Sequence, residues 1–494
     1  MQVCPGLGHL ESLRKLLPDA QISGADDIGI SGCACDLHQL RPGDLFLALH
    51  SARMGYDSLA EAIARGCAGI LSDRPLPELD IPVCLVSNAR EAFGLICQAL
   101  AGHPSDNLKV IGVTGRNGKT TTSCLIAGVL AHAGHKVGLL STLGYFDGEE
   151  VENSAEGTPQ ADRLATLLAR MVRNGCSHAV MNVSNRALAQ SHVAGVSYDA
   201  ACVTNVIRDH LYGHAISKDY RPAGSRLFDH LRGEALVVIN VDDPLSAGYL
   251  RQIDGPALTI GIDSPAEITG TPIEQFPSEQ TFLITAGSDT MPVQTQMIGR
   301  HHIYNCLTAT AVGLAYGIDL PRIVRTLEAA KHVPGRLERI ECGQPFSVFV
   351  DFAHTPDALA GCLQTLKTVI KGRLICVFGA VNGGDESQRP LLGRAVEQDA
   401  DAAIITSGNP RDKEQTAIMQ DLLGGFENPN HAQMIPDRSA AIHRALSMAQ
   451  RGDCVLIAGK GYETLEIEDE ESLSPDDRQI ASDWLYEVQP FAKG

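Results

Sequence analysis

The sequence lacks the segments that would direct a chain into a membrane or across it. No charged stretch followed by an apolar run opens the chain, and no apolar run is long enough to span a bilayer. Short internal repeats and low-complexity tracts are also absent. These absences predict a soluble, cytoplasmic protein that does not have a membrane as a partner.

Positive charge is scarce. The chain has 40 Lys and Arg against 59 Asp and Glu, which gives a formal net charge of −19. An acidic surface repels nucleic acid and anionic lipid, so we expect neither as a general partner. This charge is still compatible with a local basic pocket for a nucleotide. No feature of the sequence identifies a protein partner, so that question stays open.

The cysteines are placed like core residues. The chain has 14 of them, mostly within apolar runs. Cysteines in such positions are usually small buried hydrophobes in a reducing compartment. We expect burial for Cys84, Cys202, Cys376 and Cys454.

With 494 residues the chain is too long for one hydrophobic core, and domains of about 100–200 residues predict about three of them. Residues 103–106 (HPSD) interrupt helix and strand periodicity and predict a linker. Residues 332–335 (HVPG) predict a second one. We therefore expect domains at 1–104, 105–335 and 336–494.

Strands alternate with helices in the second and third segments, which predicts the α/β class with parallel sheets covered on both faces. The third segment is typical of a smaller, doubly wound, Rossmann-like domain. The strands expected along the chain are at 44–49, 69–72, 108–113, 136–140, 178–183, 200–203, 347–352, 373–378, 402–406 and 454–458. The helices expected are at 57–65, 89–101, from about 120, at 356–370 and at 438–450.

The strongest local motif is a glycine-rich turn between a buried strand and a helix, VIGVTGRNGKTT at 110–121. Backbone N–H groups at such a turn point at a bound phosphate, and the helix dipole favours its negative charge. Lys119 can reach the β- and γ-phosphates of a nucleotide, and the Thr120 hydroxyl can ligate magnesium. Val113 stands where the strict phosphate-loop pattern has its first glycine. The alternative is a plain glycine turn between strand and helix.

This turn is similar to the ATP loop of the Mur ligases, and further motifs of that family follow in the same order. The matching segments are TNVIRDHL at 204–211, NVDDP at 240–244, PGRLE at 334–338 and VDFAHTPDAL at 350–359. The resemblance covers nearly the whole chain. Residues 30–46 resemble the UDP-sugar domain of the MurE and MurF branches. NPR at 409–411 and GKGYE at 459–463 favour the MurE branch that takes meso-diaminopimelate.

The resemblance implies three domains: an N-terminal UDP-sugar-binding domain, a central phosphate-loop domain that binds ATP and a C-terminal Rossmann-like domain that binds the amino acid. It implies an ATP-dependent amide ligase that adds a meso-diaminopimelate-like amino acid to UDP-N-acetylmuramoyl-L-Ala-D-Glu in peptidoglycan precursor synthesis. The implied catalytic residues are Lys119, His210 and Arg336. The implied ATP-binding residues are Gly115, Asn117, Gly118, Lys119, Thr120, Thr121, Asp351 and His354. The implied amino-acid-binding residues are Asn409, Arg411, Gly459 and Glu463.

Several positions depart from the family pattern. Asn182 stands where the family has a magnesium-binding glutamate, and Arg186 where it has a histidine near the metals. Gly224 stands where it has a lysine that is carbamylated to hold a second magnesium. Thr120 remains as a metal ligand, so we expect at most one magnesium ion. The other replaced positions are Arg116 beside the phosphates and Gly384 and Gly408 in the amino-acid site.

Two interpretations follow from these departures. In one, the chain is an active but divergent ligase with impaired activity, and Arg116 or Arg186 supplies charge that magnesium supplies elsewhere. In the other, it is a catalytically degenerate homologue that binds nucleotide and acts as a regulatory or interaction protein. The sequence leaves both open, because function depends on the site and not on the fold.

Overall fold

The computed structural model describes residues 10–48, 56–154, 156–206, 223–380, 386–408, 415–462 and 476–488. The chain divides into two compact units, residues 1–268 with 305–323 and residues 269–304 with 324–494. Within the described ranges, no helix is long and apolar enough to cross a membrane.

The first unit begins with a small, mostly parallel sheet. Its strands in spatial order are β2 (Gln21–Ser23), β7 (Val83–Leu85), β6 (Gly69–Ser72), β5 (Asp44–Leu47) and β4 (Gly32–Ala34). Helix α3 (Ala89–Leu100) begins after Asn88, whose side chain accepts the backbone N–H of Glu91. Phe93 and Ile96 of this helix pack with Leu45 and Leu71 of the sheet in one core. Helix α2 covers Tyr56–Ala64. The short elements β1 (Glu11–Ser12) and α1 (Leu13–Leu16) precede β2, and β3 (Gly29–Ile30) lies between β2 and β4 in the chain.

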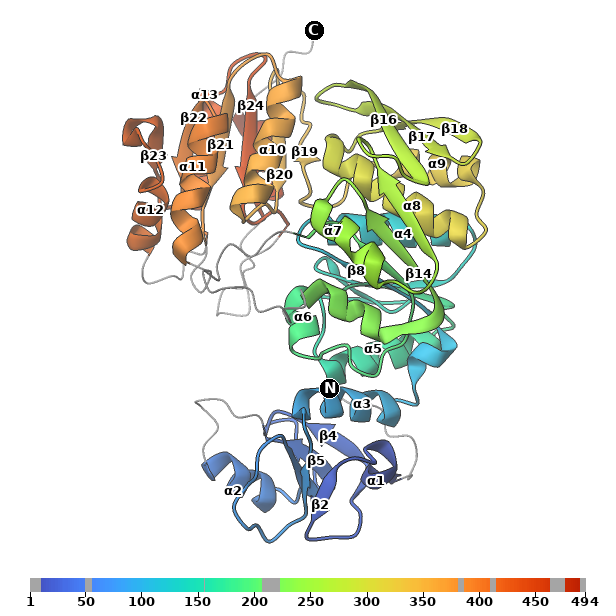
Figure 1. The fold of residues 1–494 in the computed structure, drawn as a ribbon. Helices are drawn as coiled ribbons and strands as arrows, with labels where there is room; N and C mark the ends of the chain where they lie inside the picture. Colours follow the sequence, from blue (N-terminus) through green and yellow to red (C-terminus); the bar gives the residue numbers. More distant parts are fainter. Residues whose placement is uncertain are drawn as a thin grey trace. The chain divides into compact units, whose positions relative to one another are not determined.

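A larger sheet follows in the same unit, and most of it is parallel. Its strands in spatial order are β11 (Val151–Glu152), β10 (Gly144–Phe146), β9 (Val137–Ser141), β12 (His178–Asn182), β8 (Lys109–Thr114), β13 (Tyr198–Val203), β14 (Leu231–Asn240) and β15 (Ala257–Gly261). The strands from β9 to β15 pair in parallel, whereas β10 and β11 are antiparallel additions at the edge. β8 lies between β12 and β13, so three parallel strands end side by side at the turn that follows β8 (Figure 1).

The helices of this unit cover the larger sheet. They also flank its carboxyl edge, by which we mean the side at which the parallel strands end. They are α4 (Lys119–His132), α5 (Ala161–Arg173), α6 (Asn185–Ala189), the 3-10 helix η2 (Ala223–His230), α7 (Pro244–Gly248) and η3 (Tyr249–Gln252). α4 contacts β8, β9 and β12, and α6 packs against η2. Leu164, Leu168 and Met171 of α5 pack with Leu140 and Met181 of the sheet.

The expected linker at 103–106 is a packed turn. Residues Pro104–Asn107 form the 3-10 helix η1, and the preceding residue, His103, has a φ of 50°. Ser105 is buried, and its carbonyl oxygen accepts a hydrogen bond from Arg232. The segment is therefore held against the larger sheet at this point.

The second unit contains a six-stranded sheet that is covered on both faces (Figure 1). Its strands in spatial order are β19 (Glu338–Arg339), β20 (Ser347–Asp351), β24 (Cys454–Ala458), β21 (Leu374–Phe378), β22 (Ala402–Ile405) and β23 (Ala432–Met434). All neighbours are parallel except β19 and β20. α10 (Pro356–Val369), α11 (Arg389–Asp399) and α12 (Gln415–Leu423) pack on one face, and α13 (Arg438–Met448) and α14 (Asp477–Val488) on the other.

The remaining elements were not expected from the sequence. They are the antiparallel strands β16 (Ile268–Gln275), β17 (Gln280–Ala286) and β18 (Asp289–Thr295), the helices α8 (Arg300–Ala315) and α9 (Leu320–Ala329), and the short 3-10 helices η4 (Glu386–Gln388) and η5 (Pro429–His431). The expected α/β class is confirmed, and the expected strands and helices agree with the structure to within about two residues. Cys84, Cys202, Cys376 and Cys454 are fully buried and unbridged, as expected.

Candidate active site

The glycine turn after β8 has the backbone that its sequence predicts. Gly115 and Gly118 have φ values of 134° and 83°, in the region that favours glycine. A Cβ atom at Gly115 would lie 2.2 Å from the Thr204 hydroxyl oxygen, and one at Gly118 would lie 2.7 Å from Asn305 Oδ1. Both the conformation and the close packing therefore require glycine at these two positions.

The end of the neighbouring strand β13 holds this turn in place. Thr204 Oγ1 donates to the carbonyl oxygen of Asn117 at 2.7 Å. The side chain of Asn205 accepts from Asn117 N at 3.0 Å and donates to Asn117 O at 3.0 Å. The carbonyl oxygen of Asn205 accepts from Arg116 N at 3.2 Å. Thr204 and Asn205 were not among the expected site residues, although the parallel pairing of β8 with β13 places them beside the turn.

A cation and a helix start meet inside the turn. Lys119 Nζ donates to the carbonyl oxygens of Gly115 at 2.8 Å and Arg116 at 2.9 Å. Helix α4 begins after Gly118, and no side chain caps it. The first N–H groups of a helix without a side-chain cap, together with an adjacent ammonium group, form an anion site. The arrangement suits a phosphate group.

Thr120, the expected magnesium ligand, lies in a cluster of neutral polar side chains. Its hydroxyl oxygen lies 3.0 Å from Thr142 Oγ1 and accepts from Asn182 Nδ2 at 3.1 Å. Ser123 Oγ donates to Asn182 Oδ1 at 2.9 Å, and Thr158 Oγ1 donates to the backbone oxygen of Asn182 at 3.0 Å. Thr120, Ser123, Thr158 and Asn182 are buried, and Thr142 is half-buried. We call them the threonine cluster.

The threonine cluster offers oxygen atoms to a cation but no negative charge. Magnesium prefers oxygen ligands and is usually held by carboxylates together with phosphate oxygens of the substrate. In the part of the chain that the structure describes, no group of three or more His, Cys, Asp and Glu side chains could hold a metal ion. The donor set therefore fits a magnesium ion that arrives with a nucleotide, with Thr120 as its protein ligand.

A second group of site residues gathers at the carboxyl edge of the six-stranded sheet. Asp351 ends β20, and its carboxylate accepts the backbone N–H of Leu337 and of Ala353, each at 2.6 Å. Phe352 N donates to Gly335 O at 2.9 Å. One carboxylate oxygen of Asp351 thus holds the turn that carries Arg336, and the other holds the turn that follows β20.

Aromatic contacts fix the side chains beside that turn. The guanidinium carbon of Arg336 lies 4.5 Å from the centre of the Phe352 ring, which is a cation–π contact. The ring of Phe352 also lies 4.8 Å from the His354 ring and 6.2 Å from the Tyr462 ring. Beneath them, burial raises the pKa of the Cys362 thiol well above its ordinary value, and the Asp351 carboxylate raises it further. This thiol stays protonated and acts as a core side chain.

The first turn of α14 fastens two loops of this edge. Glu338 accepts Gly335 N at 2.7 Å and pairs with Arg478 at 3.5 Å. Arg438 donates to Ala458 O at 2.9 Å and forms a buried ion pair with Asp477 at 2.6 Å. The loop after Gly335 and the loop after Ala458 are therefore tied to the same helix.

Gly459 lies in the second of these loops. Its φ is 110°, its N–H donates to Asp351 O at 3.0 Å, and an added Cβ atom would lie 3.4 Å from Gly379 O. Gly408 is the last described residue before a gap, at the end of β22. The expected site residues that lie outside the described residues are His210, Gly384, Asn409, Arg411 and Glu463.

Comparison with known proteins places this architecture. Residues 113–313 match the model of the Mur ligase middle domain, and residues 335–461 match that of the Mur ligase glutamate ligase domain. The UDP-N-acetylmuramoyl-L-alanyl-D-glutamate–2,6-diaminopimelate ligase of Geobacillus thermodenitrificans (strain NG80-2) is 36% identical over 480 residues, which are 96% of this chain and 98% of the relative. The enzyme of the same name from Bacillus cereus is 34% identical over 481 residues, again 96% and 98%.

The chain belongs to the Mur ligase family. A solved structure of a 2,6-diaminopimelate ligase of this kind superposes with a TM-score of 0.67 at 26% identity, over 97% of this chain and 99% of the other. The MurF ligase of Thermotoga maritima in complex with ADP gives a TM-score of 0.58 at 18% identity, over 92% and 96%, which shows a shared fold. The expected three-domain Mur ligase architecture is thus confirmed, and Mur ligases are ATP-dependent enzymes that need magnesium.

Three positions of this Mur ligase, 182, 186 and 224, lie close together. We interpret them as positions at which metal-site residues are replaced. Asn182 ends β12, Arg186 is in the short helix α6 that follows, and Gly224 is in η2, which packs against α6. A Cβ atom at Gly224 would lie 3.6 Å from Asn185 Oδ1 and 3.7 Å from the Tyr249 hydroxyl, which is ordinary contact. Position 224 can therefore accept a side chain.

Arg186 is the one charged side chain among these three. Its side chain is 70% exposed, and its guanidinium lies 3.9 Å from Glu156. An exposed pair at this distance adds little stability. The guanidinium is therefore not fixed by a buried partner in the way that Arg438 is.

Proposed function

We propose that this chain is an ATP-dependent amide ligase of the MurE type. It would join meso-diaminopimelate, or a closely similar diamino diacid, to UDP-N-acetylmuramoyl-L-Ala-D-Glu during peptidoglycan precursor synthesis. The observation that carries the proposal is the match to two 2,6-diaminopimelate ligases along 96% of the chain. The phosphate-binding geometry around Gly115, Gly118 and Lys119 supports the use of a nucleotide.

The chemistry proposed has two steps. The free carboxylate of the substrate attacks the γ-phosphorus of ATP, which gives an acyl phosphate and releases ADP. The amine of the amino acid then attacks the acyl carbon, so that an amide forms and phosphate leaves. The first step brings two anions together, and in the second step negative charge develops on the acyl oxygen and on the leaving phosphate. Catalysis therefore depends on positioned positive charge. Magnesium held by Thr120 would supply part of that charge when bound.

Residues of the phosphate turn and of the C-terminal part of the chain would bind the substrates. Lys119 and the N–H groups at the start of α4, from Gly118 to Thr121, bind the phosphates. Gly115 and Asn117 complete the ATP loop, and Asp351 and His354 contribute to the nucleotide side. His210 and Arg336 act with Lys119 at the reacting groups. Arg411 pairs with the distal carboxylate of the amino acid, because guanidinium and carboxylate form a bidentate pair. Asn409, Gly459 and Glu463 complete the pocket, with Glu463 on the distal ammonium group.

The neutral threonine cluster leads us to propose a slow ligase with at most one magnesium ion. Removal of one preorganised charged contact commonly lowers a rate by about 10²–10³. The alternative, a nucleotide-binding protein that has lost ligation, has no support among the relatives, which are named as ligases. The domain limits near residues 104 and 335 also remain proposals.

Purified protein with ATP, magnesium, UDP-N-acetylmuramoyl-L-Ala-D-Glu and either meso-diaminopimelate or lysine tests the function. We expect a slow, diaminopimelate-dependent release of phosphate and a ligated product by mass spectrometry, both abolished in Lys119→Ala. A preference for lysine would overturn the amino-acid assignment. Nucleotide binding without any ligation would favour the degenerate alternative, and two ordered magnesium ions in a complex with an ATP analogue would contradict the metal count.

A further inference from the structure

The edge hairpin of the larger sheet begins and ends at the threonine cluster. Thr142, in the turn between β9 and β10, contacts Thr120, and Thr158, which follows β11, contacts the backbone of Asn182. Thr158 Oγ1 also accepts the backbone N–H of Ser184 at 3.0 Å. A Cβ atom at Gly157 would lie 2.8 Å from Thr142 Cγ2, so the two ends of the excursion touch. Movement of the hairpin would therefore move groups that contact Thr120 and Asn182.

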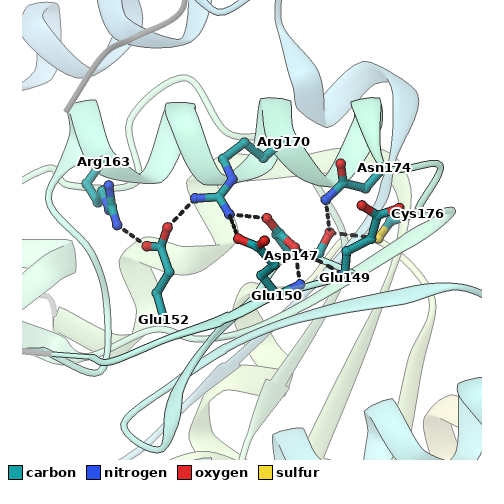
Figure 2. Close-up of polar contacts among 8 residues, drawn as sticks. All are labelled: Asp147, Glu149, Glu150, Glu152, Arg163, Arg170, Asn174 and Cys176. Carbon is teal, nitrogen blue, oxygen red and sulfur yellow. Dashed lines mark hydrogen bonds and ion pairs between the residues drawn. The ribbon is translucent and has the colours of Figure 1, made fainter.

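The other end of the hairpin is fastened by ion pairs (Figure 2). Arg170 of α5 pairs with Asp147, in the turn between β10 and β11, and with Glu152, at the end of β11. Arg163, two turns earlier on the same helix, pairs with Glu152 as well. We call these four residues the hairpin strap. The side chains of Arg170 and Asp147 are only 18% and 2% exposed, so water screens their pair weakly.

Asp147 is also bonded within its own turn. Its Oδ1 accepts the N–H of Glu149 at 3.0 Å and of Glu150 at 2.9 Å, and its backbone oxygen accepts from Asn174 Nδ2 at 3.2 Å. Burial raises the pKa of Asp147, but these N–H groups and the Arg170 guanidinium together lower it below its ordinary value. Asp147 is thus ionised at neutral pH and able to hold Arg170.

The inner strand of the hairpin is also held by the sheet and its core. β10 pairs with β9, and the buried Tyr145 side chain lies in the same core as Leu164 and Leu168 of α5. β11 has two residues and pairs with β10 alone at the edge of the sheet, and its Val151 side chain is exposed. A short two-stranded hairpin is marginal without further packing. The strap therefore supplies ion pairs that fix β11 and the β10–β11 turn on α5.

We propose that the hairpin strap positions Thr142 and Thr158, and through them the Thr120 hydroxyl and the Asn182 amide of the nucleotide site. Arg170 is the central positioning residue, since it pairs both with Asp147 of the β10–β11 turn and with Glu152 of β11. The inference rests on the proposed function in one respect, namely that Thr120 contacts a bound magnesium nucleotide. Positioning by the strap differs from a purely stabilising role. In a stabilising role, loss of Arg170 would lower the unfolding free energy and leave the nucleotide site unchanged.

The test measures nucleotide affinity with and without magnesium, by calorimetry with a non-hydrolysable ATP analogue. Arg170→Ala should lower affinity in magnesium by about tenfold, within the range usual for coupled neighbours, and should change it little in EDTA. Arg170→Lys should restore part of the loss, because one ammonium can still reach one carboxylate. Arg173→Ala, an exposed arginine on the same helix, is the matched control and should bind like the parent chain.

A double-mutant cycle separates positioning from stability. The double variant Arg170→Ala with Thr142→Val should lose less magnesium-dependent affinity than the two single variants lose together. The losses in unfolding free energy of the two single variants should instead be additive. Additive losses in affinity, or an Arg170→Ala chain that is less stable but binds normally, would overturn the proposal.

Hydrogen exchange in the nucleotide-free protein tests the positioning role separately from the proposed function. If the parent chain binds no nucleotide, the proposed function is refuted, but the exchange measurement still tests the strap. Arg170→Ala should speed exchange in the hairpin and also at Ser184 and in the first turn of α4. Faster exchange confined to the hairpin would overturn the positioning role.

Discussion

The hairpin between β9 and α5 has a charged cluster at one end and a neutral one at the other. At the β10–β11 turn, the hairpin strap pairs two arginines with two carboxylates. At the opposite turn, the threonine cluster consists of hydroxyls and one amide, beside the turn that suits phosphate. The carboxylates of the hairpin strap therefore hold structure, whereas Thr120 contacts the neutral side chains of Thr142 and Asn182.

The difference has an energetic consequence for the nucleotide-free protein. A buried carboxylate needs a cation or several N–H donors, because its desolvation costs several kcal/mol. The amide of Asn182 instead donates to Thr120 and accepts from Ser123, so it is satisfied without a metal ion. The threonine cluster is thus complete in the absence of magnesium, and any metal must compete with hydrogen bonds that already exist.

The strongest way to break this contrast is to move charge into the threonine cluster. The triple variant Asn182→Glu, Arg186→His and Gly224→Lys should raise the ligation rate by about 10²–10³, because it restores charged and metal-binding groups near the phosphates. The contacts around Gly224 leave room for the new side chain. The measurement is the initial rate of phosphate release with meso-diaminopimelate, at several magnesium concentrations.

A matched triple variant carries Asn182→Gln in place of Asn182→Glu. It has the same length at position 182 without the charge, and we expect most of the gain to disappear. Equal gains in both variants would show that shape and not charge limits the parent chain. Rapid turnover by the parent chain would contradict the contrast itself.

The next largest effect is expected for Lys119, at the helix start beside the phosphate turn. Lys119→Ala should weaken ATP binding by about 10–100-fold, since hydrogen bonds to a charged group contribute about 1.5–3 kcal/mol each. Lys109→Ala, at the start of the preceding strand β8, is the control, because Lys109 pairs with Asp199 and its side chain is 57% exposed. Calorimetry on folded protein measures both. Unchanged affinity in Lys119→Ala would remove the phosphate role of this residue.

The parallel sheets could be predicted from the sequence because their strands are continuous apolar runs. β21 and β24 are buried at every position, and such strands occur where helices cover both faces. The antiparallel strands gave no such pattern. β18 is mostly exposed or half-buried and contains Pro292, and β11 has only two residues. Propensity and periodicity are weak guides for short, half-exposed strands.

Some features of the candidate site could likewise be predicted from the sequence, and others could not. Gly115 and Gly118 could be predicted, because only glycine adopts their backbone conformation beside such close neighbours. The partners of Asn182 could not, since Thr120 and Ser123 are 62 and 59 residues away in the chain. Asp351 is expected beside ATP from its motif, but the two backbone N–H groups that its carboxylate accepts could not be predicted. Long-range pairings of this kind depend on the fold.

A smaller effect is expected when the neutral amide of Asn182 is removed from the threonine cluster. Asn182→Ala leaves the buried hydroxyls of Thr120 and Ser123 without their shared partner, which should cost about 1–2 kcal/mol of unfolding free energy. Urea unfolding measures this change. Asn428→Ala, which removes the exposed side-chain cap of η5, is a control of the same chemistry at the surface. If added magnesium nucleotide does not stabilise Asn182→Ala while it stabilises the parent chain, the amide is part of the nucleotide site.

The smallest effect concerns the charged cluster and its dependence on pH. Asp147→Asn keeps an oxygen for the N–H groups of Glu149 and Glu150 but loses the ion pair with Arg170. The variant should therefore be less stable by about 1 kcal/mol at pH 7, between the values usual for exposed pairs and for charged hydrogen bonds.

The sign of the pH dependence follows from the lowered pKa of Asp147 in the folded chain. A carboxyl whose pKa falls on folding stabilises the protein fully above its ordinary pKa, about 4, and loses that contribution as the pH falls through the lowered value. Asparagine does not titrate. The difference in unfolding free energy between the parent chain and Asp147→Asn should thus be constant from pH 7 to about 5 and shrink below about 4. Glu149→Gln is the control, because the pair of Glu149 with Lys136 is exposed and should give no measurable difference. A difference for Asp147→Asn that persists unchanged to pH 3 would show that the Arg170 pair is not its source.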